Sequence, residues 1–227
     1  MHCFLCDADS AAGSKACEVC GKLLATDPDR YFKAGMEAMA AGGIDRSIRL
    51  LTDCVSMNPQ HMSGRYNLGL ALSLGNKHDE AMEQYLAIIE QDPRYPGVYT
   101  ALGQAAFGSY LAHMEEAEAQ RKAMIQLLAK AIDLDPEDVD AHFSLANAYI
   151  AIGTADKAIP HLKRALALHP DSSAIHFTIA HAFKMLGKYE EATIMATRAM
   201  QLAGTDDPFW EDIRNLLSEL EQTVLPR

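Results

Sequence analysis

Apolar, small and polar residues recur along most of the chain in a block of about 34 residues, and prolines set the register of this block. A similar segment rich in apolar residues precedes successive prolines, as at residues 87–92 before Pro93 and 165–169 before Pro170. Because proline disfavours continuation of a helix, each segment predicts the C-terminal end of a helix. The period therefore predicts stacked helical hairpins, which is an all-α fold.

One repeat is longer than the others. A single repeat length separates Pro59 from Pro93 and Pro136 from Pro170, and Gly204 lies one more repeat length on. The step from Pro93 to Pro136 is longer by nine. The extra residues lie within 107–124, where the composition favours helix and contains no turn signal. We expect the insertion to lengthen the helices of this repeat by a couple of turns.

Small residues occupy the places where the two helices of each hairpin must touch. In the first segments these are Gly35, Gly69, Gly103, Ala146 and Ala180, and in the second segments Ala81, Ala158 and Ala192. Small residues at these places, in phase with the prolines, resemble the tetratricopeptide repeat (TPR) family. The resemblance covers five repeats over residues 25–205, at about 28–61, 62–95, 96–138 with the insertion, 139–172 and 173–206.

This resemblance implies a right-handed superhelical solenoid of helix-turn-helix repeats, closed by a C-terminal capping helix at residues 206–227. Asp207 is the predicted N-cap of that helix and Pro208 its first residue. The predicted apolar face of the helix then consists of residues at helical spacing: Phe209, Ile213, Leu216, Leu217 and Leu220.

In TPR proteins the first helices line a concave groove, so the resemblance also implies a set of candidate binding residues. One position per repeat gives a ladder that is mostly aromatic: Phe32, Tyr66, Thr100, Phe143 and Phe177. Neighbouring positions on the same helices add Met36, Met39, Leu70, Gln104, Phe107, Asn147 and His181. Aromatic residues are also common there as scaffold, so the ladder predicts either packing or binding. The methionines favour binding, because flexible thioethers repack around varied partners.

The N-terminal residues 1–24 carry two C-x-x-C pairs, formed by Cys3 with Cys6 and by Cys17 with Cys20. Such knuckles let four thiolates converge on one ion, so they predict a closed tetrahedral metal site. The segment resembles a short zinc ribbon, in which Zn²⁺ would supply the folding free energy that so short a core lacks. A closed site predicts a structural rather than a catalytic metal.

Other ligands for the four cysteines stay open at this point. Iron in a rubredoxin-like site uses similar knuckles, usually within a larger aromatic core. Disulfides are disfavoured, because the N-terminus has no secretory pattern and a fifth cysteine, Cys54, leaves an odd number. We expect Cys54 to lie in the helical core.

Charge, hydropathy and the absence of known catalytic motifs argue against several classes of function. The net charge of −11, without a basic patch, disfavours nucleic acid as a partner. No apolar run is long enough to span a membrane, so we expect a cytoplasmic protein. No phosphate-binding glycine motif, nucleophile elbow or HExxH motif is present, which predicts that the chain is not an enzyme.

The sequence thus predicts a scaffold that binds a protein or peptide partner in its TPR groove. Two alternatives remain: an iron- or zinc-containing accessory subunit of a redox enzyme complex, and a scaffold that assembles with copies of itself. Each alternative keeps the same fold and differs in the partner.

Overall fold

The computed structural model describes residues 27–112 and 117–224. Over these two ranges the chain forms eleven helices and no strand, which confirms the all-α prediction. The chain divides into two compact units between residues 115 and 116. Each unit is therefore described by itself.

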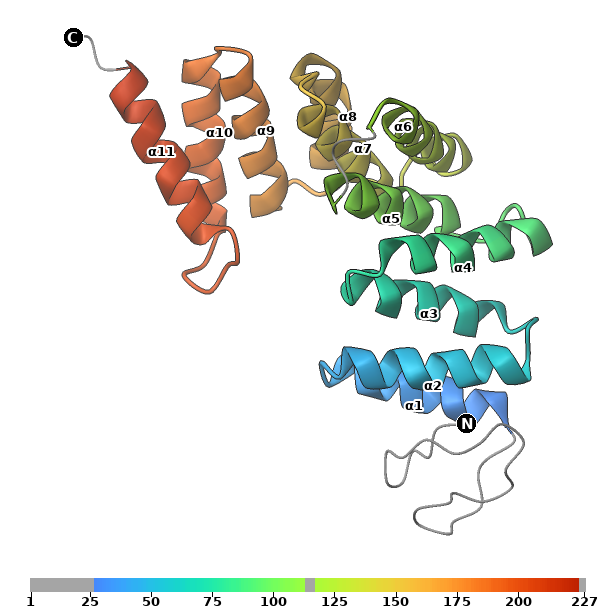
Figure 1. Cartoon of the computed structure of the whole chain (residues 1–227). Coiled ribbons are helices and arrows are strands. Elements are labelled where there is room, and N and C mark those ends of the chain that lie inside the picture. The colour runs from blue at the N-terminus through green and yellow to red at the C-terminus, as the bar shows by residue number, and fades with distance from the viewer. Residues whose placement is uncertain (1–26, 113–116, 225–227) are drawn as a thin grey trace. The chain divides into compact units, whose positions relative to one another are not determined.

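The first unit consists of helices that stack as successive hairpins, with α3 packed against α2 and α4 (Figure 1). These helices are α1 (Pro28–Ala40), α2 (Ile44–Met57), α3 (Met62–Leu74), α4 (His78–Gln91) and α5 (Val98–Ala112).

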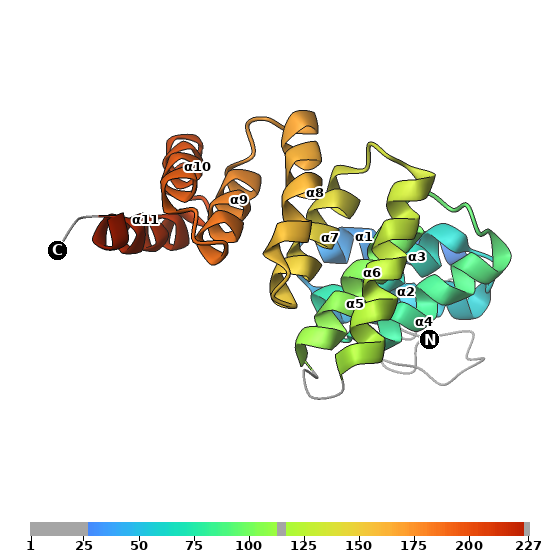
Figure 2. The ribbon, with the colours of Figure 1, turned by 90° about the horizontal axis from the view of Figure 1, so that it is seen from above.

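The second unit contains two complete hairpins, α7–α8 and α9–α10, with α6 packed on the first and α11 on the second (Figure 2). Its helices are α6 (Ala117–Leu134), α7 (Val139–Ala151), α8 (Ala155–Leu168), α9 (Ser173–Met185), α10 (Tyr189–Leu202) and α11 (Trp210–Val224).

The helix ends follow the predicted period. α2, α4, α6 and α8 each end two residues before the prolines that set the register. At the other end, four first helices receive a side-chain cap at the same place in the repeat, from Asp27, His61, Asp138 and Ser172. Each of these side chains accepts a hydrogen bond from a backbone N–H group that has no partner within the helix.

The turn between the two helices of a repeat depends on a left-handed backbone. This conformation recurs at Gly42, Asn76, Gly153 and Gly187, with φ between 58° and 79°. Asparagine is among the few residues with a side chain that tolerate this region, which explains why Asn76 can replace glycine. The second helices that follow, α2, α4, α8 and α10, have no side-chain cap.

The predicted small residues do lie where helices touch. Ala81, Ala146, Ala158, Ala180 and Ala192 are fully buried. At Gly69 an added Cβ atom would lie 2.5 Å from the ring of Tyr85, which is itself fully buried. Glycine is thus required there because the Tyr85 ring occupies the space that any side chain would need.

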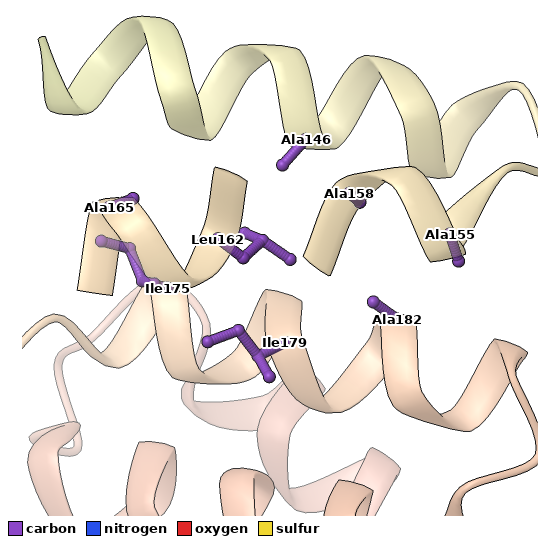
Figure 3. Close-up of a cluster of buried hydrophobic side chains, with 8 residues drawn as sticks. All are labelled: Ala146, Ala155, Ala158, Leu162, Ala165, Ile175, Ile179 and Ala182. Atoms are coloured by element: carbon purple, nitrogen blue, oxygen red, sulfur yellow. The ribbon is translucent and has the colours of Figure 1, made fainter. Parts of the chain in front are cut away.

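Leu162 of α8 lies at the centre of the core of the second unit, among small residues and two isoleucines of α9 (Figure 3). Its partners include Ala146 of α7 and Ile179 of α9. This cluster joins three helices of two successive repeats. Burial of these apolar side chains stabilises the stack, as expected where each hairpin cannot cover its own apolar face.

The insertion lengthens the helices of its repeat, as predicted. α5 has 15 residues where α1, α3, α7 and α9 have 13, and α6 has 18 where α2, α4, α8 and α10 have 14. Residues 113–116 between them lie outside the described ranges.

The capping role of α11 is confirmed, but its predicted start is wrong. Ile213, Leu216 and Leu220 are buried, and the latter two pack against alanines of α9 and α10. The helix begins at Trp210 rather than Pro208. The Asp207 carboxylate accepts a hydrogen bond from the N–H group of Phe209, which closes a tight turn ahead of the helix.

Candidate functional site

The predicted groove residues lie on the first helices of the repeats. In the first unit, α3 contacts both α1 and α5, so the first helices are neighbours. We name the side of α1, α3 and α5 that carries the predicted residues the inner face of the first unit: Met36, Met39, Leu70, Gln104 and Phe107. Helical spacing places Leu74 and Leu111 on the same side, four residues after Leu70 and Phe107.

The aromatic ladder serves mainly as packing between repeats. The Phe32 ring lies 5.2 Å from the ring of His61, which immediately precedes α3. The Tyr66 ring lies 5.6 Å from that of Tyr95, in the connection to α5. Each ring thus rests on the segment that leads to the next first helix. Aromatic pairs at such distances are stabilising.

The same contact recurs in the second unit, where the Phe177 ring lies 6.0 Å from the ring of Phe209, just before α11. Phe143 instead packs against the Leu162 cluster. Thr100 is only 6% exposed, so it offers a partner no surface. The four ladder aromatics are half-buried, so a partner can reach only part of each ring.

Accessible apolar side chains of the first unit lie beside this ladder. Leu74 is 61% exposed and Leu111 is 49% exposed, while Met36, Met39 and Leu70 are half-buried. Gln104 is exposed and Phe107 is half-buried. Sequence reasoning missed the two leucines, although their helical spacing from predicted residues could have revealed them. The inner face of the first unit is therefore apolar, with one amide.

The two predicted residues of the second unit beside the ladder are polar. Asn147 is half-buried and His181 is exposed. Lys184 of α9 forms an ion pair with Glu219 of α11. Partial desolvation of the His181 ring and the nearby Lys184 charge lower the pKa of His181 below its ordinary value. Met185, which has the place in α9 that Leu74 has in α3, is 45% exposed, so the first helices of the second unit carry both polar and apolar side chains.

A polar network that the sequence did not reveal links the two helices of one repeat. The Nδ1 atoms of His142 and His161 are 3.2 Å apart, and Nε2 of His142 is 3.2 Å from the carbonyl oxygen of Pro136. Since that carbonyl can only accept, His142 donates through Nε2 and accepts from the N–H group of His161. The two histidines are 19 residues apart in the sequence and meet only when the hairpin folds.

The second repeat contains the same network with other residues. Arg65, like His142, is the fourth residue of its helix, and it donates both to Gln84 (3.0 Å) and to the carbonyl oxygen of Pro59 (3.1 Å). The network therefore belongs to the repeat architecture, and His161 takes the place of Gln84. A structural role follows for the His142–His161 pair.

We expect the stability of the chain to fall as the pH falls below about 6.5, because burial and His142 lower the pKa of His161 from its ordinary value of 6.5. The unfolded chain then binds the proton more readily. His161→Gln, which copies Gln84, should reduce the pH dependence by up to about 1.4 kcal/mol per pH unit for one proton. Urea unfolding at several pH values between about 5 and 8 measures it.

His181→Asn is the matched comparison, since the pKa of His181 is lowered too. Equal pH slopes for the unaltered chain and His161→Gln would contradict the assignment to His161.

The prediction that Cys54 lies in the helical core is confirmed. Cys54 is a free thiol and fully buried. Burial raises the pKa of this thiol to about 11, which keeps it protonated at neutral pH. Cys54 therefore packs as an apolar side chain.

The four N-terminal cysteines lie outside the described residues, so the zinc site stays a prediction. Within residues 27–112 and 117–224, no three potential metal-binding side chains gather at one place. No helix in the same part of the chain combines the length and the apolar character that a bilayer crossing requires.

Comparison with protein families gives one result. The family described as tetratricopeptide repeat matches residues 32–96 and 117–173, and a second pattern of the same description matches residues 153–214. No curated protein matches the chain.

Solved structures with the same fold include TTC0263, a thermophilic TPR protein of Thermus thermophilus. It is 24% identical, with a TM-score of 0.70 over 86% of this chain and 99% of that one. MamA is 22% identical, with a TM-score of 0.62 over 77% and 91% of the two chains. YrrB, described as a TPR protein with an unusual peptide-binding site, is 14% identical, with a TM-score of 0.60 over 87% and 93%. At these identities the likeness shows the fold alone.

Proposed function

Because the chain belongs to the tetratricopeptide repeat family, we propose that it is a scaffold whose inner face in the first unit binds a peptide or helix of a partner protein. TPR solenoids present such faces to other proteins, and catalysis is not their usual role. The observation that carries the proposal is the apolar inner face itself, where Leu74 and Leu111 are about half exposed or more.

The chemistry of this face indicates the partner segment. Neighbouring exposed apolar side chains mark interaction surfaces. Met36 and Met39 add flexible side chains that adapt to different apolar shapes. Gln104 is the one exposed amide among the predicted residues, and it can bond to a peptide backbone. A partner segment with apolar side chains on one side, such as an amphipathic helix, fits this face.

We expect the double substitution Leu74→Ser and Leu111→Ser to weaken partner binding about tenfold or more, since each leucine loses apolar contact with the partner. Peptides selected against the full chain by phage display, and their affinities by calorimetry, measure the effect. Leu86→Ser is the matched control, because Leu86 is 47% exposed on α4, a second helix of the same unit. The exposed leucines are preferable to ladder residues such as Phe143, where alanine would also disturb packing.

Three other outcomes separate the alternatives. Equal binding by the double variant, with loss in Leu86→Ser, would move the site to the second helices. If affinity capture from a cell lysate with the full chain as bait retains only further copies of the chain, a self-assembling scaffold is indicated. Capture of a redox enzyme by residues 1–24 would favour an accessory subunit.

A further inference from the structure

The second unit carries a surface feature whose residues the proposed function does not use. A cavity of about 670 Å³, open to solvent, is lined mainly by residues of α10 with one residue of α9. The lining includes His176, Thr193, Ile194, Met195, Thr197 and Arg198. This volume lies in the range of ligand-binding sites.

One ring nitrogen of His176, Nε2, has no hydrogen-bond donor as a partner among the described residues. The residue is only 6% exposed, and its Nδ1 atom donates to the carbonyl oxygen of Ser172 at 2.9 Å. In the neutral ring, Nε2 is therefore an acceptor. Among the described residues, nothing donates to it. His176 is among the residues that line the cavity, so a group bound there can approach the ring.

The preceding repeat bonds its histidine differently. His142 and His176 occupy the same place in successive repeats, but His161 of the fourth repeat is replaced by Met195 in the fifth. His142 uses both ring nitrogens, on His161 and Pro136. His161 bonds to Nδ1 of His142, whereas Nδ1 of His176 donates to Ser172, so the two rings are bonded differently. The thioether of Met195 cannot donate a hydrogen bond to the His176 ring.

The hydroxyl groups of the cavity also offer only acceptors. Thr193 donates to the carbonyl oxygen of Tyr189 at 2.9 Å, and Thr197 donates to that of Thr193 at 2.8 Å. Their hydrogens are thus engaged, and their oxygens keep lone pairs. Ile194, which is 63% exposed, and Met195 supply the apolar surface.

We propose that this cavity binds an aromatic ring with a single N–H donor, an indole such as the side chain of tryptophan. The N–H group donates to Nε2 of His176, and the ring lies on Ile194 and the thioether of Met195. Arg198 forms an ion pair with Asp171 (3.8 Å) and donates a hydrogen bond to Gln201 (3.3 Å). Its guanidinium group borders the cavity and can pack on the face of the bound indole ring. Indole fits because its one polar group is a donor, which the Nε2 acceptor of His176 requires, and the rest of its ring is apolar.

The test uses the full chain with labelled isoleucine and methionine methyl groups, followed by NMR during titration with N-acetyltryptophanamide. Its 1-methylindole analogue keeps the ring and lacks the donor. We expect saturable shifts of the Ile194 and Met195 methyl signals, with binding about three- to tenfold weaker for the methylated probe, the usual effect of one hydrogen bond. In His176→Phe, which keeps a buried ring, both probes should bind equally.

His169→Phe, the same exchange at an exposed histidine of the same unit, should keep the preference for the unmethylated probe. The proposal is overturned if neither methyl signal shifts, if the unaltered chain binds both probes equally, or if His176→Phe retains the preference. Leu74→Ser and Leu111→Ser should leave this binding unchanged, so its failure is distinguishable from failure of the proposed function.

Discussion

Replacing Leu162 with alanine is expected to lower the free energy of unfolding by about 2–5 kcal/mol, the cost of removing a fully buried leucine. Leu162 contacts alanines on its own and neighbouring helices, and these are too small to fill the space that the leucine leaves. The lost burial and the remaining void therefore add. Chemical unfolding followed by circular dichroism measures the change.

Leu134→Ala is the matched control, since Leu134 belongs to the same unit and is 44% exposed. It should change the free energy of unfolding by less than about 0.5 kcal/mol. In a repeat protein the effect of Leu162→Ala should also spread to the adjacent repeats, because each hairpin is stabilised by its neighbours. A loss below about 1 kcal/mol would mean that the Leu162 cluster does not hold these repeats together.

Replacing Cys17 and Cys20 with serine is expected to reduce bound zinc from about one ion per chain to none. Two thiolates cannot complete a tetrahedral site, while the helices from Pro28 onward pack through their own core and should keep their circular dichroism signal. Elemental analysis of the purified full chain measures the metal. The cysteines themselves lie outside the described residues.

Cys54→Ala is the control for this experiment, because it removes a buried core thiol and should leave the metal in place. Unchanged zinc in the double serine variant would remove the four-cysteine assignment. Iron in place of zinc would give a red protein and would support the accessory-subunit alternative.

Much of the helical framework could be predicted from local signals. Prolines that follow a helix mark its end, and left-handed turn residues separate the two helices of a repeat, although Pro160 lies inside α8. These signals placed the helix ends before Pro59 and Pro170. They were less reliable at Asp207, where a turn and a helix cap use the same side-chain chemistry and only the path of the backbone distinguishes them.

The candidate binding surface was only partly predictable. Family resemblance placed Phe32 and Thr100 in one ladder with Met36 beside it, but it could not show how much of each side chain is covered by the next repeat. That depends on contacts such as the one between Phe32 and His61, which lies at the start of the following repeat. Residues far apart in sequence meet only when the repeats stack, so exposure follows from packing rather than from position in the pattern.

By itself, the amino-acid sequence determined the repeat length, the helix ends, the small residues at helix crossings and the acidic charge, because these depend on residue type and spacing along the chain. Only the tertiary structure decided which side chains remain open. It joined His142 to His161, left Nε2 of His176 without a donor, and exposed Leu74 beside a half-buried Tyr66. Each outcome depends on which neighbouring helix covers a side chain, and that is a property of the packed repeats.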